Sequence, residues 1–127
     1  MDRINRMTVD DQLTARILEG CFEVSNELGA GFLESVYEKA LAVALSQKGL
    51  TVRAQIPLKV KFRGVILGDF FGDLLINESV LVELKAVTRI LPEHKAQVNN
   101  YLKATGIAIG LLVNFGVPRM EYYRLHK

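Results

Sequence analysis

The apolar pattern of this chain changes its period once, at Thr51, and this change limits the folds that the chain can adopt. Before Thr51 the apolar residues recur at steps of three or four, the spacing of a buried helical stripe: Leu13, Ile17, Cys21, Val24 and Leu28. After Thr51, residues 52–63 alternate between apolar and polar side chains, which is the period of a β-strand. The pattern predicts a domain that contains both helices and strands.

The segment before Thr51 predicts a pair of helices. The first helix begins near Asp10 or Asp11 and ends before Gly29, a residue that suits a left-handed helix cap. The second helix closes at Lys48-Gly49 and repeats apolar residues at helical spacing, at Leu33, Tyr37, Ala40 and Ala44.

The segment after Thr51 predicts three strands in a meander. Pro57 places the first strand, residues 52–63, at a sheet edge or at a bulge. Its apolar side chains are predicted to share one face, and they are Val52, Ala54, Ile56, Leu58, Val60 and Phe62. Arg63-Gly64 predicts a hairpin turn, and strands at 65–76 and 79–87 follow, separated by the polar break Asn77-Glu78.

The last part of the chain predicts a helix and a central strand. Pro92 suits a first helical position, and the helix stops at Gly106. Residues 107–113 are apolar on both faces, which is typical of a fully buried strand, and residues 120–125 add an edge strand. The order is helix, helix, three strands, helix and strand, which predicts an α/β sandwich with a mixed sheet.

The composition excludes several classes of protein. The 127 residues, of which 50% are hydrophobic, fit one domain. No stretch approaches the roughly twenty apolar residues of a membrane span, and no apolar secretory segment follows Arg3 and Arg6, so we expect a cytoplasmic protein without a membrane partner. Cys21 is the only cysteine, which excludes an intrachain disulfide. The formal net charge of +2 is too small for adhesion to nucleic acid by charge alone.

Ionisable residues interrupt two of the predicted strands. Asp73 lies inside the apolar stretch 70–76, and Glu83 and Lys85 interrupt residues 79–87. Such groups are costly to bury without partners. If the loop between the two strands has three residues, 77–79, Asp73 lies directly opposite Glu83, and Lys85 points from the same face. A two-residue loop would pair Asp73 with Val82 and scatter the charges.

Two readings of this charged face are open. Carboxylates about 4 Å apart repel by roughly 4 kcal/mol at an effective dielectric near 20, a cost that a divalent cation removes. Asp73, Glu83 and the backbone carbonyl of Leu84 are hard ligands suited to Mg²⁺ or Mn²⁺, and Lys85 would orient or deprotonate an attacking water. The chemistry would be hydrolysis of a phosphodiester. In the second reading, Lys85 forms ion pairs with the two carboxylates on a partly exposed sheet face.

Five segments of the chain resemble the GxxExxY protein family, and they occur in the same order. The resemblance covers about Leu13 to Pro118 and rests on Gly31-Phe32-Leu33-Glu34-Ser35-Val36-Tyr37, Gly72-Asp73-Leu74, Val82-Glu83-Leu84-Lys85-Ala86, Gln97 to Tyr101-Leu102, and Leu111-Leu112-Val113-Asn114-Phe115-Gly116. That family is grouped with the PD-(D/E)XK nuclease-like superfamily. The resemblance implies one such domain over residues 1–127, with 1–9 as a flexible N-terminus. It also implies a restriction-endonuclease-like αβββαβ core with an extra N-terminal helix.

The resemblance also implies roles for individual residues. Asp73 would be the motif aspartate, Glu83 and Lys85 the E-x-K pair, Glu34 an acidic metal or water ligand, and Gln97 a polar residue of the following helix. Gly72 departs from the proline of the superfamily label. From the residues alone, Glu34 could instead serve the first turn of its helix by binding free amides.

Several other residues are candidates for contact with a substrate. Tyr37 is expected to pack its ring in the core with its hydroxyl at the rim of the site. Tyr101 shares a helical face with Gln97, and His94 lies one turn before them. Three basic residues of the first strand could contact a phosphate backbone or could simply be solvated: Lys59, Lys61 and Arg63.

We therefore expect a Mg²⁺-dependent (or Mn²⁺-dependent) hydrolase of nucleic acid, with a homodimer or a partner protein completing the substrate groove. The alternative is a catalytically silent module of the same fold that binds nucleic acid or protein. A third hypothesis is a structural protein whose charged face forms an interface.

Overall fold

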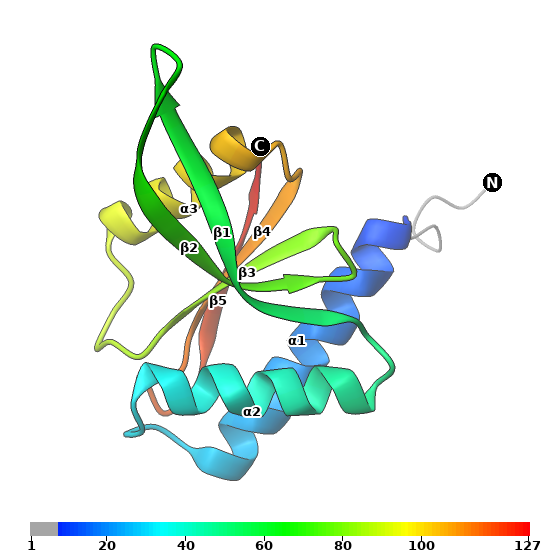
Figure 1. The fold of residues 1–127 in the computed structure, drawn as a ribbon. Coiled ribbons are helices and arrows are strands. Elements are labelled where there is room, and N and C mark those ends of the chain that lie inside the picture. Colours follow the sequence, from blue (N-terminus) through cyan, green and yellow to red (C-terminus); the bar gives the residue numbers. More distant parts are fainter. Residues whose placement is uncertain (1–7) are drawn as a thin grey trace, which may run out of the picture.

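The computed structural model describes residues 8–127, and it contains three helices and five strands in this part of the chain. In chain order these are α1 (Val9–Leu28), α2 (Glu34–Gln47), β1 (Val52–Phe62), β2 (Val65–Ile76), β3 (Val80–Lys85), α3 (Pro92–Thr105), β4 (Ile109–Asn114) and β5 (Glu121–His126) (Figure 1). The order matches the one that the sequence predicts. Of the expected flexible N-terminus, residues 1–7 lie outside the described residues, whereas Thr8 caps α1 and Val9 begins it.

The five strands form one mixed sheet in the order β1-β2-β3-β4-β5. Strands β3 and β4 are parallel, and the other neighbours are antiparallel. Strand β1 is an edge strand, which agrees with Pro57. Strand β4 lies inside the sheet and all six of its residues are buried, so the prediction of a central strand is confirmed.

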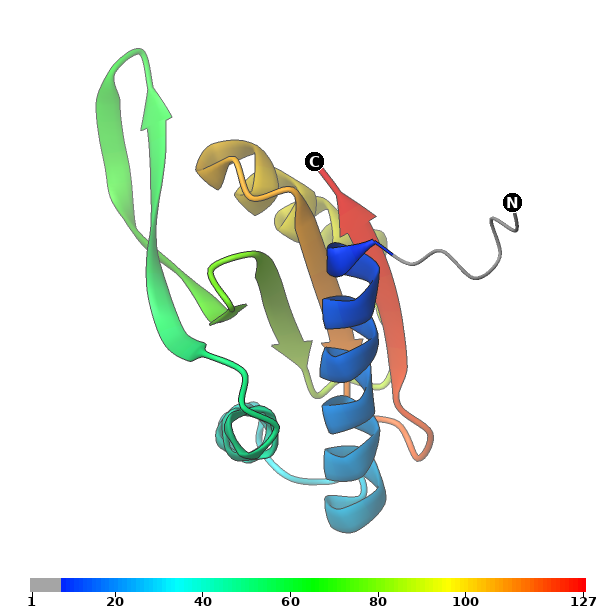
Figure 2. The same ribbon diagram turned by 90° about the vertical axis from the view of Figure 1, so that its right-hand side faces the viewer.

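Helices cover both faces of the sheet (Figure 2). Helices α1 and α2 pack on one face through a core that includes Ile17 and Leu41, and α3 packs on the other face through Val98 and Leu102. The residues that alternate with the charged side chains along β2 and β3 all belong to the core under α1 and α2, and they are Leu74, Ile76, Val80, Val82 and Leu84. The charged face of β2 and β3 therefore lies on the α3 side of the sheet.

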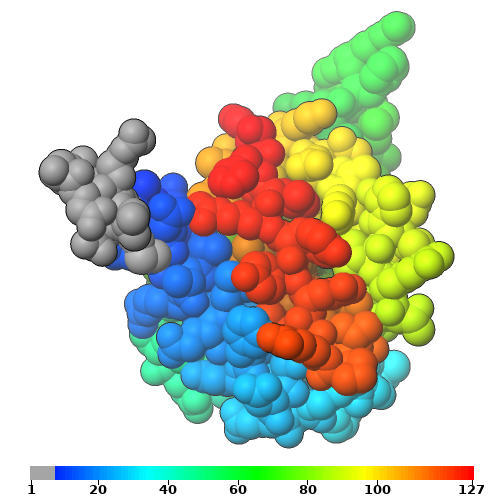
Figure 3. Space-filling view, turned by 180° about the vertical axis from the view of Figure 1, so that it is seen from behind, coloured from blue at the N-terminus to red at the C-terminus, as the bar shows by residue number. Residues whose placement is uncertain are grey.

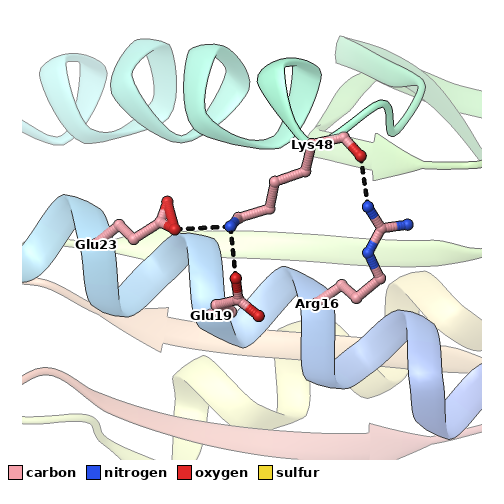
Figure 4. A network of polar contacts seen from close by, with 4 residues as sticks. All are labelled: Arg16, Glu19, Glu23 and Lys48. Carbon is pink, nitrogen blue, oxygen red and sulfur yellow. Dashed lines mark hydrogen bonds and ion pairs between the residues drawn. The ribbon is translucent and has the colours of Figure 1, made fainter.

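The ends of the helices are fixed by polar contacts. The Thr8 hydroxyl accepts a hydrogen bond from the Asp11 N–H at 3.0 Å, and Asp11 accepts one from the Thr8 N–H, which forms a capping box. At the other end of the helical pair, the Lys48 ammonium lies 2.7 Å from Glu19 and 2.6 Å from Glu23 (Figure 4). These ion pairs join the C-terminal end of α2 to the middle of α1.

Strand β5 is tied to α1 on the side of the molecule shown in Figure 3. The Arg124 guanidinium lies 2.8 Å from the carboxylate of Asp11, which anchors the predicted edge strand to the first helix. The first helix and the last strand are therefore in contact. In the same view the hairpin of β1 and β2 projects beyond the rest of the molecule (Figure 3).

The prediction that the apolar side chains of residues 52–63 share one face is wrong for part of the strand. Val52 packs against the core under α1 and α2, but Ile56 and Leu58 pack in the core under α3. The cause is Gln55, whose φ of 52° is left-handed and reverses the alternation of side chains. The paired register of β1 and β2 skips this position.

Beyond this kink the two strands leave the body of the sheet. We call residues 56–72 the outer hairpin. All of residues 61–70 are exposed, and in Figures 1 and 2 the outer hairpin rises away from the sheet on the side of α3. The predicted turn is confirmed, because Arg63 and Gly64 have φ values of 50° and 80°.

Candidate active site

The register of β2 and β3 is the one predicted for a three-residue loop. The paired residues are Leu74 with Val82, Leu75 with Leu81, and Ile76 with Val80. Continued by one step, this register sets Asp73 opposite Glu83. The paired ladder ends before that step, so the two strands diverge where the two carboxylates lie.

At this point a backbone N–H of each strand donates a hydrogen bond to the carboxylate of the other strand, in place of the ladder bonds. The Asp73 N–H donates to Glu83 Oε1 at 3.1 Å, and the Leu84 N–H donates to Asp73 Oδ2 at 2.8 Å. The N–H and C=O of one strand residue point to the same side. The Leu84 carbonyl therefore also points toward β2, on the side where Asp73 lies.

The two carboxylates, which we call the carboxylate pair, are placed where their charges are costly. Glu83 is only 4% exposed. Burial, with the neighbouring charge of Asp73, raises the pKa of Glu83 to about 9, and the charge of Lys85 opposes this rise. Within residues 8–127, Lys85 makes no ion pair with either carboxylate. The ion-paired reading of this face is therefore not what the structure shows.

The donor set of the carboxylate pair fits a hard divalent cation. Two carboxylates and the Leu84 carbonyl offer oxygen ligands, and Mg²⁺ is typically held by one or two carboxylates together with waters and substrate phosphates. A third acidic side chain does not join them, since no group of three or more His, Cys, Asp or Glu residues in the described part of the chain is arranged to hold a metal. Glu34 thus lies outside the immediate ligand set.

Glu34 nevertheless lies within electrostatic reach of the carboxylate pair. It is the first residue of α2, and within residues 8–127 its carboxylate accepts no hydrogen bond from the free amides of the helix. Partial burial of the carboxyl group and the charge of Asp73 raise its pKa, while the charge of Lys85 lowers it. In the described residues, hydrogen bonding to the first turn of α2 therefore does not account for Glu34.

Gln97 and Tyr101 lie on α3, and Tyr101 packs against the core on the face of the sheet that carries the carboxylate pair. The Gln97 side chain donates a hydrogen bond to the Tyr101 hydroxyl at 3.1 Å, so the two residues share a helical face as predicted. Burial and the charges of Glu83 and Asp73 raise the pKa of Tyr101.

Two predicted contacts with a substrate are better explained by structural roles. Tyr37 is fully buried, stacks on Phe115 at 4.8 Å and donates its hydroxyl to the Gly29 carbonyl at 2.6 Å, so it is a core residue. His94 Nδ1 accepts a hydrogen bond from the Leu91 N–H at 3.0 Å at the start of α3. The expected packing of the Tyr37 ring in the core is thus confirmed, and its hydroxyl is bonded to the loop that precedes α2.

The three basic residues of β1 and its turn lie on the outer hairpin, and all of them are exposed: Lys59, Lys61 and Arg63. The guanidinium of Arg63 lies 4.9 Å from the centre of the Phe62 ring. These residues belong to a projecting surface rather than to the immediate surroundings of the carboxylate pair.

Two residues that position the site were missed from the sequence as functional positions. A Cβ at Gly72 would lie 2.8 Å from Leu81 Cδ1 and 3.3 Å from Glu83 Oε1, so a larger residue here would press on both side chains. Asn114 is fully buried and bonds both the N–H and the carbonyl of Val87, each at 3.0 Å. In the sequence, Asn114 stands out as a polar residue directly after the apolar run 107–113, and this pattern could have indicated a buried polar role.

Comparison with known proteins agrees with this architecture. Residues 11–125 match the family described as the PD-(D/E)XK nuclease superfamily. The chain belongs to this superfamily, whose members generally use divalent metal ions. No curated protein matches the chain.

Two solved structures share the fold. One is titled the crystal structure of SSO0001, with a TM-score of 0.57 and 19% identity over 74% of this chain, and the chain spans about half (50%) of its length. The other is an alkaline exonuclease from Laribacter hongkongensis, with a TM-score of 0.50 and 14% identity over 94% of this chain and 82% of that one. Among residues 8–127, no helix is long and apolar enough to cross a membrane.

Proposed function

We propose that this protein is a Mg²⁺- or Mn²⁺-dependent hydrolase of phosphodiester bonds in nucleic acid. The observation that carries the proposal is the carboxylate pair, which is held across two diverging strands without an ion pair to Lys85 in residues 8–127. Buried carboxylates without a compensating cation are destabilising, so this arrangement is costly to the protein unless it binds one.

Each residue of the site has a defined part in this proposal. Asp73, Glu83 and the Leu84 carbonyl would hold the cation, which when bound supplies Lewis-acid activation of a phosphoryl oxygen and of water. Lys85, two residues after Glu83 on β3, would orient the attacking water and stabilise the charge that develops on the phosphate. Glu34 would accept a hydrogen bond from that water.

Helix α3 would hold the substrate against the carboxylate pair. The amide of Gln97 lies one helical turn from Tyr101, whose hydroxyl it bonds. A side-chain amide can bond a phosphate oxygen as a donor without adding charge. We therefore assign to Gln97 the positioning of the phosphate and to Tyr101 the wall beside it.

We further infer that the chain is a member of the GxxExxY family. The motif Gly31 to Tyr37 supports this assignment, because Glu34 begins α2 near the carboxylate pair and Tyr37 fixes the preceding loop through its hydroxyl. The motif would then combine one residue for the site with one for the core.

The proposal is tested by calorimetric titration with Mn²⁺ and by cleavage assays on single-stranded, duplex and branched DNA and RNA. Asp73→Asn is the informative variant, because the amide oxygen can still accept the hydrogen bond from the Leu84 N–H while the charge is lost. We expect Asp73→Asn to lose Mn²⁺ binding and cleavage while it keeps its fold. Lys85→Ala is expected to bind Mn²⁺ and to cleave at least 100-fold more slowly.

A binding module without catalysis is the second candidate, and the exposed, basic outer hairpin favours it. In that case a homodimer or a partner protein would use the same surface. The wild type and Lys85→Ala would then bind nucleic acid equally, neither would cleave any of the substrates, and the heat of Mn²⁺ addition would not exceed that of dilution.

A further inference from the structure

A groove runs between the outer hairpin and α3, on the same side of the sheet as the carboxylate pair. It consists of two adjoining hollows, of about 500 and about 710 Å³. Val60 of the hairpin and Asn100 of α3 line both hollows, so the two are neighbours. We call them together the hairpin groove.

The inner hollow of the groove lies on the face of the sheet that carries the candidate active site. Phe70 lines it from the hairpin, and Gln97 and Tyr101 line it from α3. Tyr101 packs against the core that contains Leu75 and Leu81, and these lie two residues from Asp73 and Glu83 on the same face of the sheet. A polymer lying in the groove would therefore run along the face that carries the site proposed for hydrolysis.

The outer hollow of the groove is basic. Lys59, Lys61 and Lys103 line it, and within residues 8–127 none of these lysines forms an ion pair. Glu93 is the only acidic residue among those that line the two hollows. The groove thus offers uncompensated positive charge at its outer end, which suits a chain of phosphates.

The inner hollow offers aromatic surface. Phe70 is 39% exposed although it is a large apolar side chain, and Tyr101 is partly exposed beside it. Exposed aromatic rings next to lysines are the combination that binds unpaired bases, since a base can stack on the ring while its phosphate meets the cation. In a duplex the faces of the bases are covered by their neighbours, so they cannot stack in this way.

We propose that the hairpin groove binds single-stranded nucleic acid, with a base stacked against Phe70 and Tyr101 and the adjoining phosphates on Lys61 and Lys103. The substrate of the function proposed above would thus be a single strand. Only the statement that the bound strand is cleaved rests on that proposed function. Single-stranded DNA and RNA share the chemistry that the groove recognises.

Binding is tested by fluorescence anisotropy with labelled probes of about 12 nucleotides, a length in the range that single-strand binding folds cover. The probes are single-stranded DNA, single-stranded RNA and a duplex of the same sequence, and binding is measured in EDTA and with Ca²⁺ over a series of salt concentrations. We expect the wild type to bind at least one single strand more tightly than the duplex.

Two sets of variants separate the contribution of base stacking to affinity from the contribution of charge. Phe70→Ala should weaken single-strand binding by roughly 5- to 150-fold without changing the salt dependence, and Phe70→Leu should show a similar loss because it keeps apolar bulk but not the ring. Lys61→Ala combined with Lys103→Ala should reduce the slope of log affinity against log salt by about 1.4, because two phosphate contacts are lost. Lys39→Ala combined with Arg119→Ala removes two exposed charges elsewhere and should change neither quantity.

Several results would overturn the inference. These are duplex binding as tight as single-strand binding, an unchanged affinity in Phe70→Ala, or a salt slope that responds equally to the Lys39 and Arg119 control. A dimer that Phe70→Ala dissociates, without single-strand binding by the wild type, would instead assign the groove to a second copy of the chain.

The inference and the proposed function fail in different ways. If the groove variants change single-strand binding as expected but no substrate is cleaved with Mg²⁺ or Mn²⁺, the groove stands and the hydrolase is refuted. If nucleic acid is cleaved with an unchanged KM in all groove variants, the hydrolase stands and the groove is refuted.

Discussion

Replacement of Glu83 by Gln should stabilise the metal-free protein at neutral pH. The side chain is buried, and burial next to Asp73 raises the pKa of Glu83 to about 9 from an ordinary value of 4.5. Above pH 4.5 the unfolded chain releases this proton and the folded chain retains it, so the free energy of unfolding falls as the pH rises toward 9. Gln has no proton to release and therefore escapes this cost.

The expected magnitude follows from the size of the shift. Each pH unit between the two pKa values costs about 1.4 kcal/mol, which limits the gain at pH 7 to about 3 kcal/mol. Because Asp73 shares the repulsion, we expect Glu83→Gln to gain about 1 to 3 kcal/mol at pH 7. The Gln amide oxygen can still accept the hydrogen bond from the Asp73 N–H, now 3.1 Å from Glu83 Oε1.

Urea unfolding in EDTA at pH 5, 7 and 8.5 measures this effect. The difference between Glu83→Gln and the wild type should be small at pH 5 and should grow as the pH rises. Mn²⁺ should then raise the stability of the wild type much more than that of Glu83→Gln. A variant that is less stable than the wild type at pH 7, or a difference in stability that does not depend on pH, would show that burial of the Glu83 carboxylate does not destabilise the folded protein.

Three further substitutions test the framework around the site. Gly72→Ala should lose about 1 to 3 kcal/mol in urea unfolding, because its Cβ would lie 2.8 Å from Leu81 Cδ1, and an unchanged midpoint would contradict the packing described. Tyr37→Phe should lose about 1 to 2 kcal/mol with Mn²⁺ binding intact, since only the two hydrogen bonds of its hydroxyl are removed, one donated to the Gly29 carbonyl and one accepted from the Phe32 N–H; loss of metal affinity would show that the Tyr37 hydroxyl contributes to the site. Asn114→Ala should lose about 1 to 3 kcal/mol and increase hydrogen exchange in the segment after β3, whereas unchanged exchange would refute its role as a clamp.

The register of the candidate site could be predicted from the sequence because it depends on parity. A three-residue loop after Ile76 is sufficient to set Asp73 opposite Glu83, and alternation then brings Lys85 to the same face. The pairing of Leu74 with Val82 confirms this register. Parity gives the consequence of each loop length without information about the rest of the fold, but the sequence left loops of two and three residues open, and the structure shows the loop of three.

The turn of the outer hairpin away from the sheet could not be predicted in the same way. The alternation of residues 52–63 is unbroken in the sequence, but the left-handed backbone of Gln55 reverses which face Ile56 and Leu58 occupy. The Gln55 side chain donates a hydrogen bond to Glu38 Oε1 at 2.6 Å, so the conformation is supported from α2. A contact of this kind joins residues 17 positions apart, and a local pattern does not report it.

The kink and the carboxylate pair occur at the same level of the sheet, and this coincidence connects the fold to the proposed chemistry. In the register of β1 and β2, the skipped position sets Gln55 opposite Asp73. On one side of Asp73 the ladder to β3 ends, and the carboxylates of Asp73 and Glu83, which we propose to hold a cation, take up the backbone hydrogen bonds there. On the other side the outer hairpin changes face and passes over α3, which creates the groove that Phe70 and Tyr101 line. A regular sheet through Asp73 would satisfy the backbone of Leu84 by ladder bonds and would leave neither a cation site nor a path for a strand to reach it.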